Sequence, residues 1–160
     1  MEVFNDANGA TVRLSFSRHS FNKEPKHVLV ICKKGSGWLL TKHKKRGLEF
    51  PGGKAEYGET IEMAAIREVW EETGGHLAKL DFIGEYEVSE KDACFVKAIF
   101  YGEIKEMEEK GDYLETAGPV LIDGDILALR RGQEYSFIMK DQVVEKALLE
   151  IEKRHGECRF

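Results

Sequence analysis

The 160-residue chain has few of the residues that mark secreted or membrane-bound proteins. Its three cysteines, Cys32, Cys94 and Cys158, are odd in number and widely spaced, and no CxxC pair occurs, so neither a disulfide framework nor a zinc site is indicated. The opening residues lack the basic and apolar regions of a signal peptide, and no apolar run approaches the roughly 18 residues of a membrane span. We therefore expect reduced thiols in a cytoplasmic protein without a membrane partner.

An excess of basic charge is also absent. Lysine and arginine number 24 against 29 aspartates and glutamates, so the net charge is −5. Because a dedicated nucleic-acid binder usually shows a basic balance, we expect no stable nucleic-acid partner. An anionic substrate would need a local basic patch or a metal ion to offset the overall charge.

What is present fits one folded domain over residues 1–160, which contains no repeat or Pro/Ser-rich linker. Apolar or alternating runs predict strands at 10–17, 27–33, 37–42, 80–88, 94–104 and 119–122, with a hairpin turn at 34–37. Helices are predicted at 60–73, before the stop signal Gly74-Gly75, and at 140–154, and segment 105–115 is expected as an acidic loop or short helix. The order predicts an α+β fold, an α/β/α sandwich with a mixed sheet between helices.

The first predicted helix carries a cluster of carboxylates. Glu68, Glu71 and Glu72 are spaced i, i+3 and i+4, which places all three on one face within one turn. Like charges at i and i+4 cost an isolated helix roughly 0.2–0.5 kcal/mol, and the macrodipole disfavours anions at this end. Bound Mg²⁺, which prefers oxygen ligands shared with substrate phosphates, would offset both penalties. The alternative is a solvated acidic face, with Glu71 paired to Arg67.

A wider pattern surrounds the cluster. Gly53 is followed after five residues by Glu59 and after seven more by residues 67–74, which read REVWEETG. This pattern resembles the Nudix box, G-x5-E-x7-R-E-U-x-E-E-x-G-U, where U is a bulky aliphatic residue, and it covers residues 53–75. Gly75 departs from the last U, so we expect an altered loop geometry with unchanged chemistry. The flanking segments PKHVLVICKKGSGWLLTKHKKRGLEFPGGK, YLETAGPVLI and YSFIMKD resemble the MutT-type branch of this family.

The resemblance implies the Nudix fold, with the box as a loop–helix–loop, and hydrolysis in which Mg²⁺ or Mn²⁺ activates water for attack on phosphorus. In this sequence the implied metal ligands are the Gly52 carbonyl, Glu68, Glu71 and Glu72. Glu68, or a partner in the cluster such as Glu71, would act as general base, and Arg67 would orient the glutamates. The residues that look structural in the motif are Gly53, Glu59 and Gly74.

Further candidates lie outside the box. Glu115 is expected to join the metal site from a later loop, with Asp112 as the second choice and ordinary surface as the alternative. Arg46 and Lys54, together with Lys44 and Lys45, are candidates for phosphate binding, although such side chains are more often solvated. Four aromatic residues could stack on a base or could pack in the core: Phe50, Trp38, Tyr135 and Phe137.

These expectations define a nucleoside triphosphate pyrophosphohydrolase that releases nucleoside monophosphate and pyrophosphate. The resemblance suggests purine nucleotides as substrates, including oxidised forms such as 8-oxo-dGTP. One alternative keeps the chemistry but takes RNA 5′-triphosphate ends, dinucleoside polyphosphates or nucleoside diphosphate sugars. A second alternative, a non-catalytic nucleotide sensor, is disfavoured because every catalytic position of the box is filled.

Overall fold

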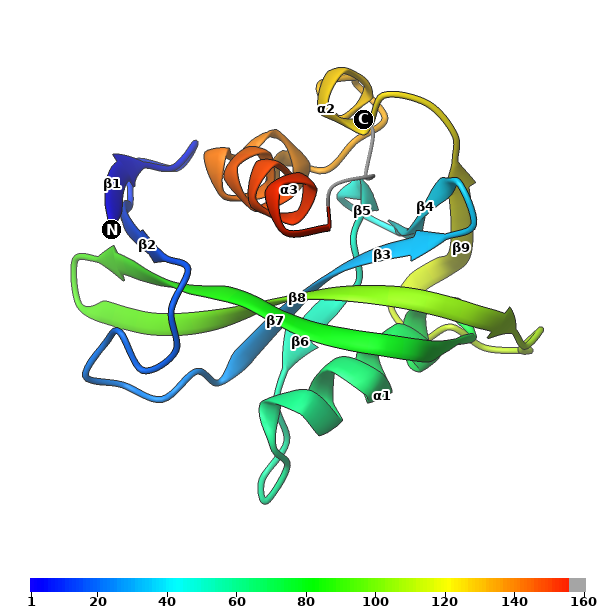
Figure 1. Ribbon diagram of the computed structural model, residues 1–160, viewed down its shortest axis with the longest axis horizontal. Coiled ribbons are helices and arrows are strands. Elements are labelled where there is room, and N and C mark those ends of the chain that lie inside the picture. The colour runs from blue at the N-terminus through cyan, green and yellow to red at the C-terminus, as the bar shows by residue number, and fades with distance from the viewer. Residues whose placement is uncertain (156–160) are drawn as a thin grey trace.

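The computed structural model describes residues 1–155, which form a mixed nine-stranded sheet with helices on both faces (Figure 1). The strands are β1 (Glu2–Asn5), β2 (Thr11–Ser15), β3 (His27–Lys34), β4 (Gly37–His43), β5 (Gly47–Glu49), β6 (Gly52–Lys54), β7 (Gly75–Glu90), β8 (Ala93–Met107) and β9 (Thr116–Ile122). The helices are α1 (Ile61–Thr73), α2 (Ile126–Leu129), the 3-10 helix η1 (Phe137–Lys140) and α3 (Gln142–His155). Among the described residues, no helix has the length and apolar character that a membrane crossing requires.

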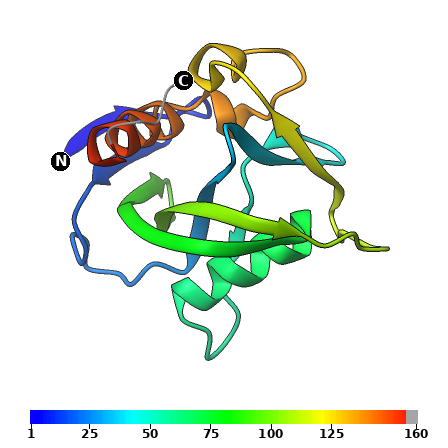
Figure 2. The same cartoon turned by 45° about the vertical axis from the view of Figure 1, so that its right-hand side comes forward.

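The strand order is β1-β2-β7-β8-β3-β4-β5, with β6 paired to β3 and β9 paired to β4. β3 and β8 run parallel, whereas β7 and β8 form a long antiparallel pair. Helix α1 covers one face of the sheet and α3 covers the other, as Figures 1 and 2 both show. The predicted α+β architecture, a mixed sheet between helices, is confirmed.

Strand β3 separates two hydrophobic cores because its successive side chains point to opposite faces. Leu29 and Ile31 pack in the core on the side of α3, while Val28, Val30 and Cys32 pack in the core on the side of α1. The predicted apolar stripe of α3 is buried in the first of these cores and consists of Val143, Val144, Ala147, Leu148 and Ile151. Burial on both faces explains why β3 reads as a continuous apolar run.

The ends of α1 follow directly from the sequence. The Thr60 side chain accepts a hydrogen bond from the Met63 N–H at 3.1 Å and so caps the first turn. Gly74 ends the helix in the left-handed conformation, with φ of 75°, and its N–H donates to the Trp70 carbonyl. The helix and its glycine stop are therefore confirmed, and β7 begins at the next residue, Gly75, without an intervening loop.

Several strand boundaries differ from the prediction. β7 begins at Gly75, whereas the sequence predicted a start at residue 80. The prediction missed these residues because irregular pairing between His76 and Lys79 interrupts the alternation of apolar and polar side chains. Segment 105–107, expected in a loop or short helix, belongs to the end of β8. The stretch at 52–54, where no strand was predicted, forms β6. It lies so close to β3 that a side chain at Gly52 would collide with the Val28 carbonyl, so glycine permits the pairing.

Besides β6, four other short elements were not predicted: β1, β5, α2 and η1. Each has three or four residues, too few for a periodic pattern. The predicted turn at 34–37 is present, because β3 and β4 pair through Lys34 and Gly37. Cys32 and Cys94 are free thiols, and Cys158 lies outside the described residues.

Gly74→Ala is expected to destabilise the fold. The left-handed conformation costs a non-glycine residue about 1–2 kcal/mol, and the new Cβ would in addition collide with the Glu108 carbonyl. Urea unfolding should show the loss. Gly111→Ala is the matched control, since no heavy atom lies within 4 Å of its added Cβ. Equal stability of the two variants would contradict the assigned role of Gly74.

Candidate active site

A pocket of about 470 Å³ lies where β6, α1 and the segment before β9 meet. Its lining residues are His43, Arg46, Gly52, Gly53, Lys54, Glu56, Arg67, Glu68, Glu71, Glu72, Leu114 and Glu115. The three clustered glutamates of α1 share this pocket with a carboxylate from far along the chain, Glu115. The pocket therefore brings together side chains that only the fold makes neighbours.

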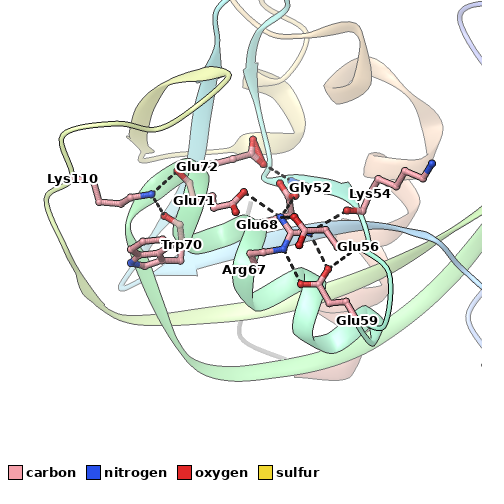
Figure 3. Close-up of polar contacts among 10 residues, drawn as sticks. All are labelled: Gly52, Lys54, Glu56, Glu59, Arg67, Glu68, Trp70, Glu71, Glu72 and Lys110. Carbon is pink, nitrogen blue, oxygen red and sulfur yellow. Dashed lines mark hydrogen bonds and ion pairs between the residues drawn. The ribbon is translucent and has the colours of Figure 1, made fainter.

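Arg67 organises one side of the pocket (Figure 3). Its guanidinium donates two hydrogen bonds to Glu59, at 2.8 and 3.0 Å, and one of its N–H groups bonds to the Lys54 carbonyl at 3.1 Å. Its remaining terminal nitrogen contacts Glu68 at 2.7 Å and Glu71 at 3.1 Å. Arg67 thus ties the loop before α1 to the glutamates on the helix, and the motif glutamate Glu59 anchors it.

Gly53 lets the backbone of β6 approach Glu68 closely. A Cβ at this position would lie 2.6–2.7 Å from the Glu68 carboxylate atoms, so the carboxylate would have to move to accommodate it. The neighbouring Gly52 N–H donates to Glu72 at 3.0 Å. The two glycines therefore hold the backbone against two of the clustered carboxylates, and substitution at Gly53 would displace Glu68.

The clustered carboxyl groups are not a solvated face. The side chains of Glu68 and Glu71 retain 13% and 23% of their exposure. Burial raises the pKa of Glu72 to about 8, while the hydrogen bond from Gly52 acts in the opposite direction. Burial also raises the pKa of Glu68, and Arg67 opposes that shift. The alternative that these glutamates form a solvated acidic face is therefore wrong for Glu68 and Glu72. The ion pair between Glu71 and Arg67, which was part of that alternative, is present.

The donor set fits a hard divalent cation. The cluster offers carboxylate oxygens, the ligands that Mg²⁺ prefers, and the absence of a side chain at Gly53 leaves room for the Glu68 carboxylate. Within residues 1–155, no three Asp, Glu, His or Cys side chains converge on one point. The reason is local, because Arg67 holds one oxygen each of Glu68 and Glu71 and Gly52 holds an oxygen of Glu72.

Comparison with known proteins agrees with this geometry. A model of the NUDIX domain matches residues 22–112, more than half of the chain. This chain belongs to the NUDIX family. Nudix hydrolases generally use divalent metal ions and act on nucleotide substrates, so the chain is an enzyme that hydrolyses phosphorus-containing anhydrides.

A curated protein and a crystal structure, both from Bacillus subtilis, resemble this Nudix enzyme over nearly its whole length. It is 46% identical over 153 residues to YtkD of strain 168, provisionally named an 8-oxo-dGTP diphosphatase, with 96% of this chain and 97% of that protein covered. It matches the crystal structure of the pyrophosphohydrolase BsRppH, a glutamate-to-alanine variant, with a TM-score of 0.92 and 45% identity over 96% and 98% of the two chains.

A more distant structure, a NUDIX hydrolase from Nitrosomonas europaea, shares the fold with a TM-score of 0.63 and 22% identity over 86% and 93% of the two chains.

The structure separates the candidates that do not occupy a fixed position of the Nudix box. Glu115 lines the pocket, whereas the Asp112 carboxylate accepts a hydrogen bond from the Leu114 N–H and is absent from the lining. Arg46 lines the pocket but makes two hydrogen bonds to the buried Glu49, at 2.9 and 3.0 Å. Lys54 lines it through β6, and its side chain points away from the glutamates (Figure 3). The roles of Glu115, Arg46 and Lys54 stay predictions.

Lys44 and Lys45 are absent from the lining. The Lys44 ammonium donates to the Leu114 carbonyl at 3.1 Å, so this lysine supports the loop beside the pocket. The carbonyl of Gly52 as a metal ligand also stays a prediction, since the contact that the structure gives this residue in the pocket is the one from its N–H to Glu72.

Three of the four aromatic candidates for base stacking are core residues. Trp38 and Phe50 are buried and pack edge to face with ring centroids 6.1 Å apart, and Tyr135 is also buried. The hypothesis that these three residues stack on a base is therefore wrong, because their side chains pack in the core beside α3. Phe137 differs: it is half-exposed and lines a second pocket.

The second pocket, of about 330 Å³, adjoins the first because Arg46 lines both. Its walls also include Phe95, Lys97, Phe137 and Asp141, and of these four Phe137 alone was a candidate from the sequence. Phe95 and Lys97 come from β8, whereas Phe137 and Asp141 come from η1 and the residue after it, so only the fold brings the two pairs together. The Lys97 ammonium lies 5.8 Å from the Phe95 ring centroid, because residues two apart on β8 share one face of the strand.

Arg67→Lys should lower kcat/KM about 10–100-fold, the range typical for residues that orient metal ligands. Lysine cannot hold Glu59 with two hydrogen bonds while also contacting Glu68 and Glu71. Arg18→Lys is the control, because Arg18 forms an exposed pair with Glu62 at 3.5 Å. Wild-type kinetics in a folded Arg67→Lys enzyme would show that Arg67 does not organise the site.

Proposed function

We propose that this Nudix enzyme is a Mg²⁺-dependent nucleoside triphosphate pyrophosphohydrolase that releases nucleoside monophosphate and pyrophosphate. The observation that carries the proposal is the pair of adjoining pockets, one lined by carboxylates and the other by aromatic and charged side chains. A triphosphate in the first pocket and a base in the second match this arrangement.

Glu68, Glu71 and Glu72 would hold the cation, with Glu115 and the Gly52 carbonyl completing the set. When bound, Mg²⁺ lowers the pKa of coordinated water and neutralises phosphate charge, although Mn²⁺ could serve equally. Arg67 orients Glu68 and Glu71 through the hydrogen bonds already formed. Glu68 would accept the proton of the attacking water, since Arg67 and Gly53 fix its carboxylate in place.

The second pocket supports a guanine base. Asp141 supplies an acceptor and Lys97 a donor, which complement the N1–H/N2–H₂ edge and the O6 of guanine, while Phe95 and Phe137 offer aromatic surface. Burial raises the pKa of Asp141 and lowers that of Lys97, and each charge opposes the shift of the other. The relatives named as 8-oxo-dGTP diphosphatases, from Bacillus subtilis and Escherichia coli, agree with guanine nucleotides, including the oxidised form.

The RNA 5′-triphosphate end is the second candidate, and a row of basic residues favours it. Lys54, His27 and Lys97 are direct neighbours across β6, β3 and β8, so their side chains share one face. Lys54 lines the first pocket and Lys97 the second. Burial and these two lysines lower the pKa of His27, which shows that positive charge gathers there. Such a row would suit the phosphodiester of a second nucleotide.

A substrate panel tests the proposal. We expect Mg²⁺ to support pyrophosphate release from 8-oxo-dGTP, dGTP and GTP, and EDTA to abolish it. Glu72→Gln should reduce turnover at least about 100-fold, since a member of the cation site is lost. Glu62→Gln is the control, because Glu62 lies on the exposed first turn of the same helix.

Turnover of triphosphorylated RNA, dinucleoside polyphosphate or nucleotide sugar alone would reject the proposed substrate while keeping the chemistry. Binding of nucleotides without turnover of any would favour a sensor.

Asp141→Asn should reduce discrimination between guanine and adenine. Asparagine has one acceptor oxygen where the carboxylate has two, so kcat/KM for GTP is expected to fall about 10-fold or more. The kcat/KM for ATP should change little. Asparagine also keeps an oxygen for the Val143 N–H, which Asp141 contacts at 3.3 Å. Asp92→Asn, in the exposed turn between β7 and β8, is the control. An unchanged ratio of GTP to ATP turnover would place the base elsewhere.

A further inference from the structure

Segment 108–115, between β8 and β9, passes over the C-terminal end of the catalytic helix. It begins with a hydrogen bond from the Glu108 N–H to the carbonyl of Gly74, the residue that caps α1, at 2.8 Å. It ends at Glu115, which lines the carboxylate pocket. The same short segment therefore touches the end of α1 and supplies a side chain to the site.

Lys110 joins the segment to the helix (Figure 3). Its ammonium donates to the carbonyls of Trp70 at 3.1 Å and Glu71 at 3.0 Å, and it lies 3.9 Å from the centroid of the Trp70 ring. The last turn of α1 contains no basic residue. Lys110 thus supplies, from another part of the chain, the positive charge that the carbonyl end of a helix favours.

The rest of the segment is fixed relative to Lys110. The Lys110 N–H donates to the Tyr113 hydroxyl at 3.0 Å, and the Tyr113 ring lies against Gly118. Leu114 has a φ of 60°, an uncommon conformation for leucine, and its N–H bonds to the Asp112 carboxylate at 2.8 Å. These contacts transmit the position of Lys110 along the segment to its end.

Lys44 holds the other end of the segment. Its N–H donates to the Glu115 carbonyl at 3.3 Å, and its ammonium donates to the Leu114 carbonyl. The next residue, Thr116, contacts the Glu72 carbonyl through its hydroxyl at 3.3 Å. Glu115 is therefore placed in the pocket by a segment fastened to the backbone of two clustered glutamates, Glu71 through Lys110 and Glu72 through Thr116.

We propose that Lys110 is a positioning residue that clamps segment 108–115 onto α1 and so delivers Glu115 to the divalent cation site. The inference rests on the proposed function, since it needs a cation at the clustered glutamates. Lys110 does not touch the pocket itself, because the contacts of its ammonium are to backbone carbonyls and aromatic rings.

Calorimetric titration of the full chain with Mn²⁺ alone tests the clamp. We expect Lys110→Met to weaken Mn²⁺ binding about 10-fold, as loss of an outer contact to a metal site does. Lys110→Arg, which keeps the charge and the donors, should restore binding. Lys91→Met, which makes the same change of charge in the exposed turn between β7 and β8, should bind as the wild type does. Lys110→Gln replaces Lys110→Met if the latter does not fold.

The double variant Lys110→Met/Glu115→Gln separates a clamp from a general structural effect. If Lys110 acts through Glu115, the second substitution should weaken Mn²⁺ binding by less than about twofold beyond Glu115→Gln alone. A full additive loss, or Mn²⁺ binding by Lys110→Met that equals the wild type, overturns the clamp while the proposed function stands. A wild-type chain that neither binds Mn²⁺ nor cleaves triphosphates overturns both.

Discussion

The Arg67 guanidinium contacts four glutamates, and the shape of the carboxylate pocket depends on those contacts. Like charges on one helical face repel each other, and the end of α1 disfavours anions. Arg67 offsets part of this repulsion at Glu68 and Glu71, and its two bonds to Glu59 fix its own position. The arrangement keeps acidic groups together in a partly buried place, where a cation would find its ligands already grouped.

The surrounding fold serves this arrangement. The close pairing of β6 with β3 places Gly53 against Glu68, and it requires glycine because a side chain would occupy the space of the carboxylate. At the C-terminal end of the helix, Gly74 turns the chain directly into β7, and the left-handed residue packs against Glu108. Two glycines of the Nudix box thus act on the catalytic helix, Gly53 beside Glu68 and Gly74 at its C-terminal end.

The sequence predicted those parts of the site that depend on local spacing. Glu68, Glu71 and Glu72 share a face because a helix of 3.6 residues per turn requires it, and Gly74 stops the helix for its own conformational reason. The sequence left base stacking open for Trp38 and Phe50 beside the commoner core packing, and the structure buries both side chains in the core. The pairing of Arg46 with Glu49, and the approach of Lys97, Asp141 and Lys110, arise from tertiary contacts that no motif records.

The central claim is that these carboxylates form one cation site. Anomalous diffraction from crystals grown with Mn²⁺ tests it directly, because the scattering peak locates the ion without reference to any substrate. The account predicts a peak within the pocket, in contact with Glu68, Glu71 and Glu72. A peak elsewhere on the molecule, or none at millimolar Mn²⁺ while Arg67 still holds Glu68 and Glu71, would contradict it.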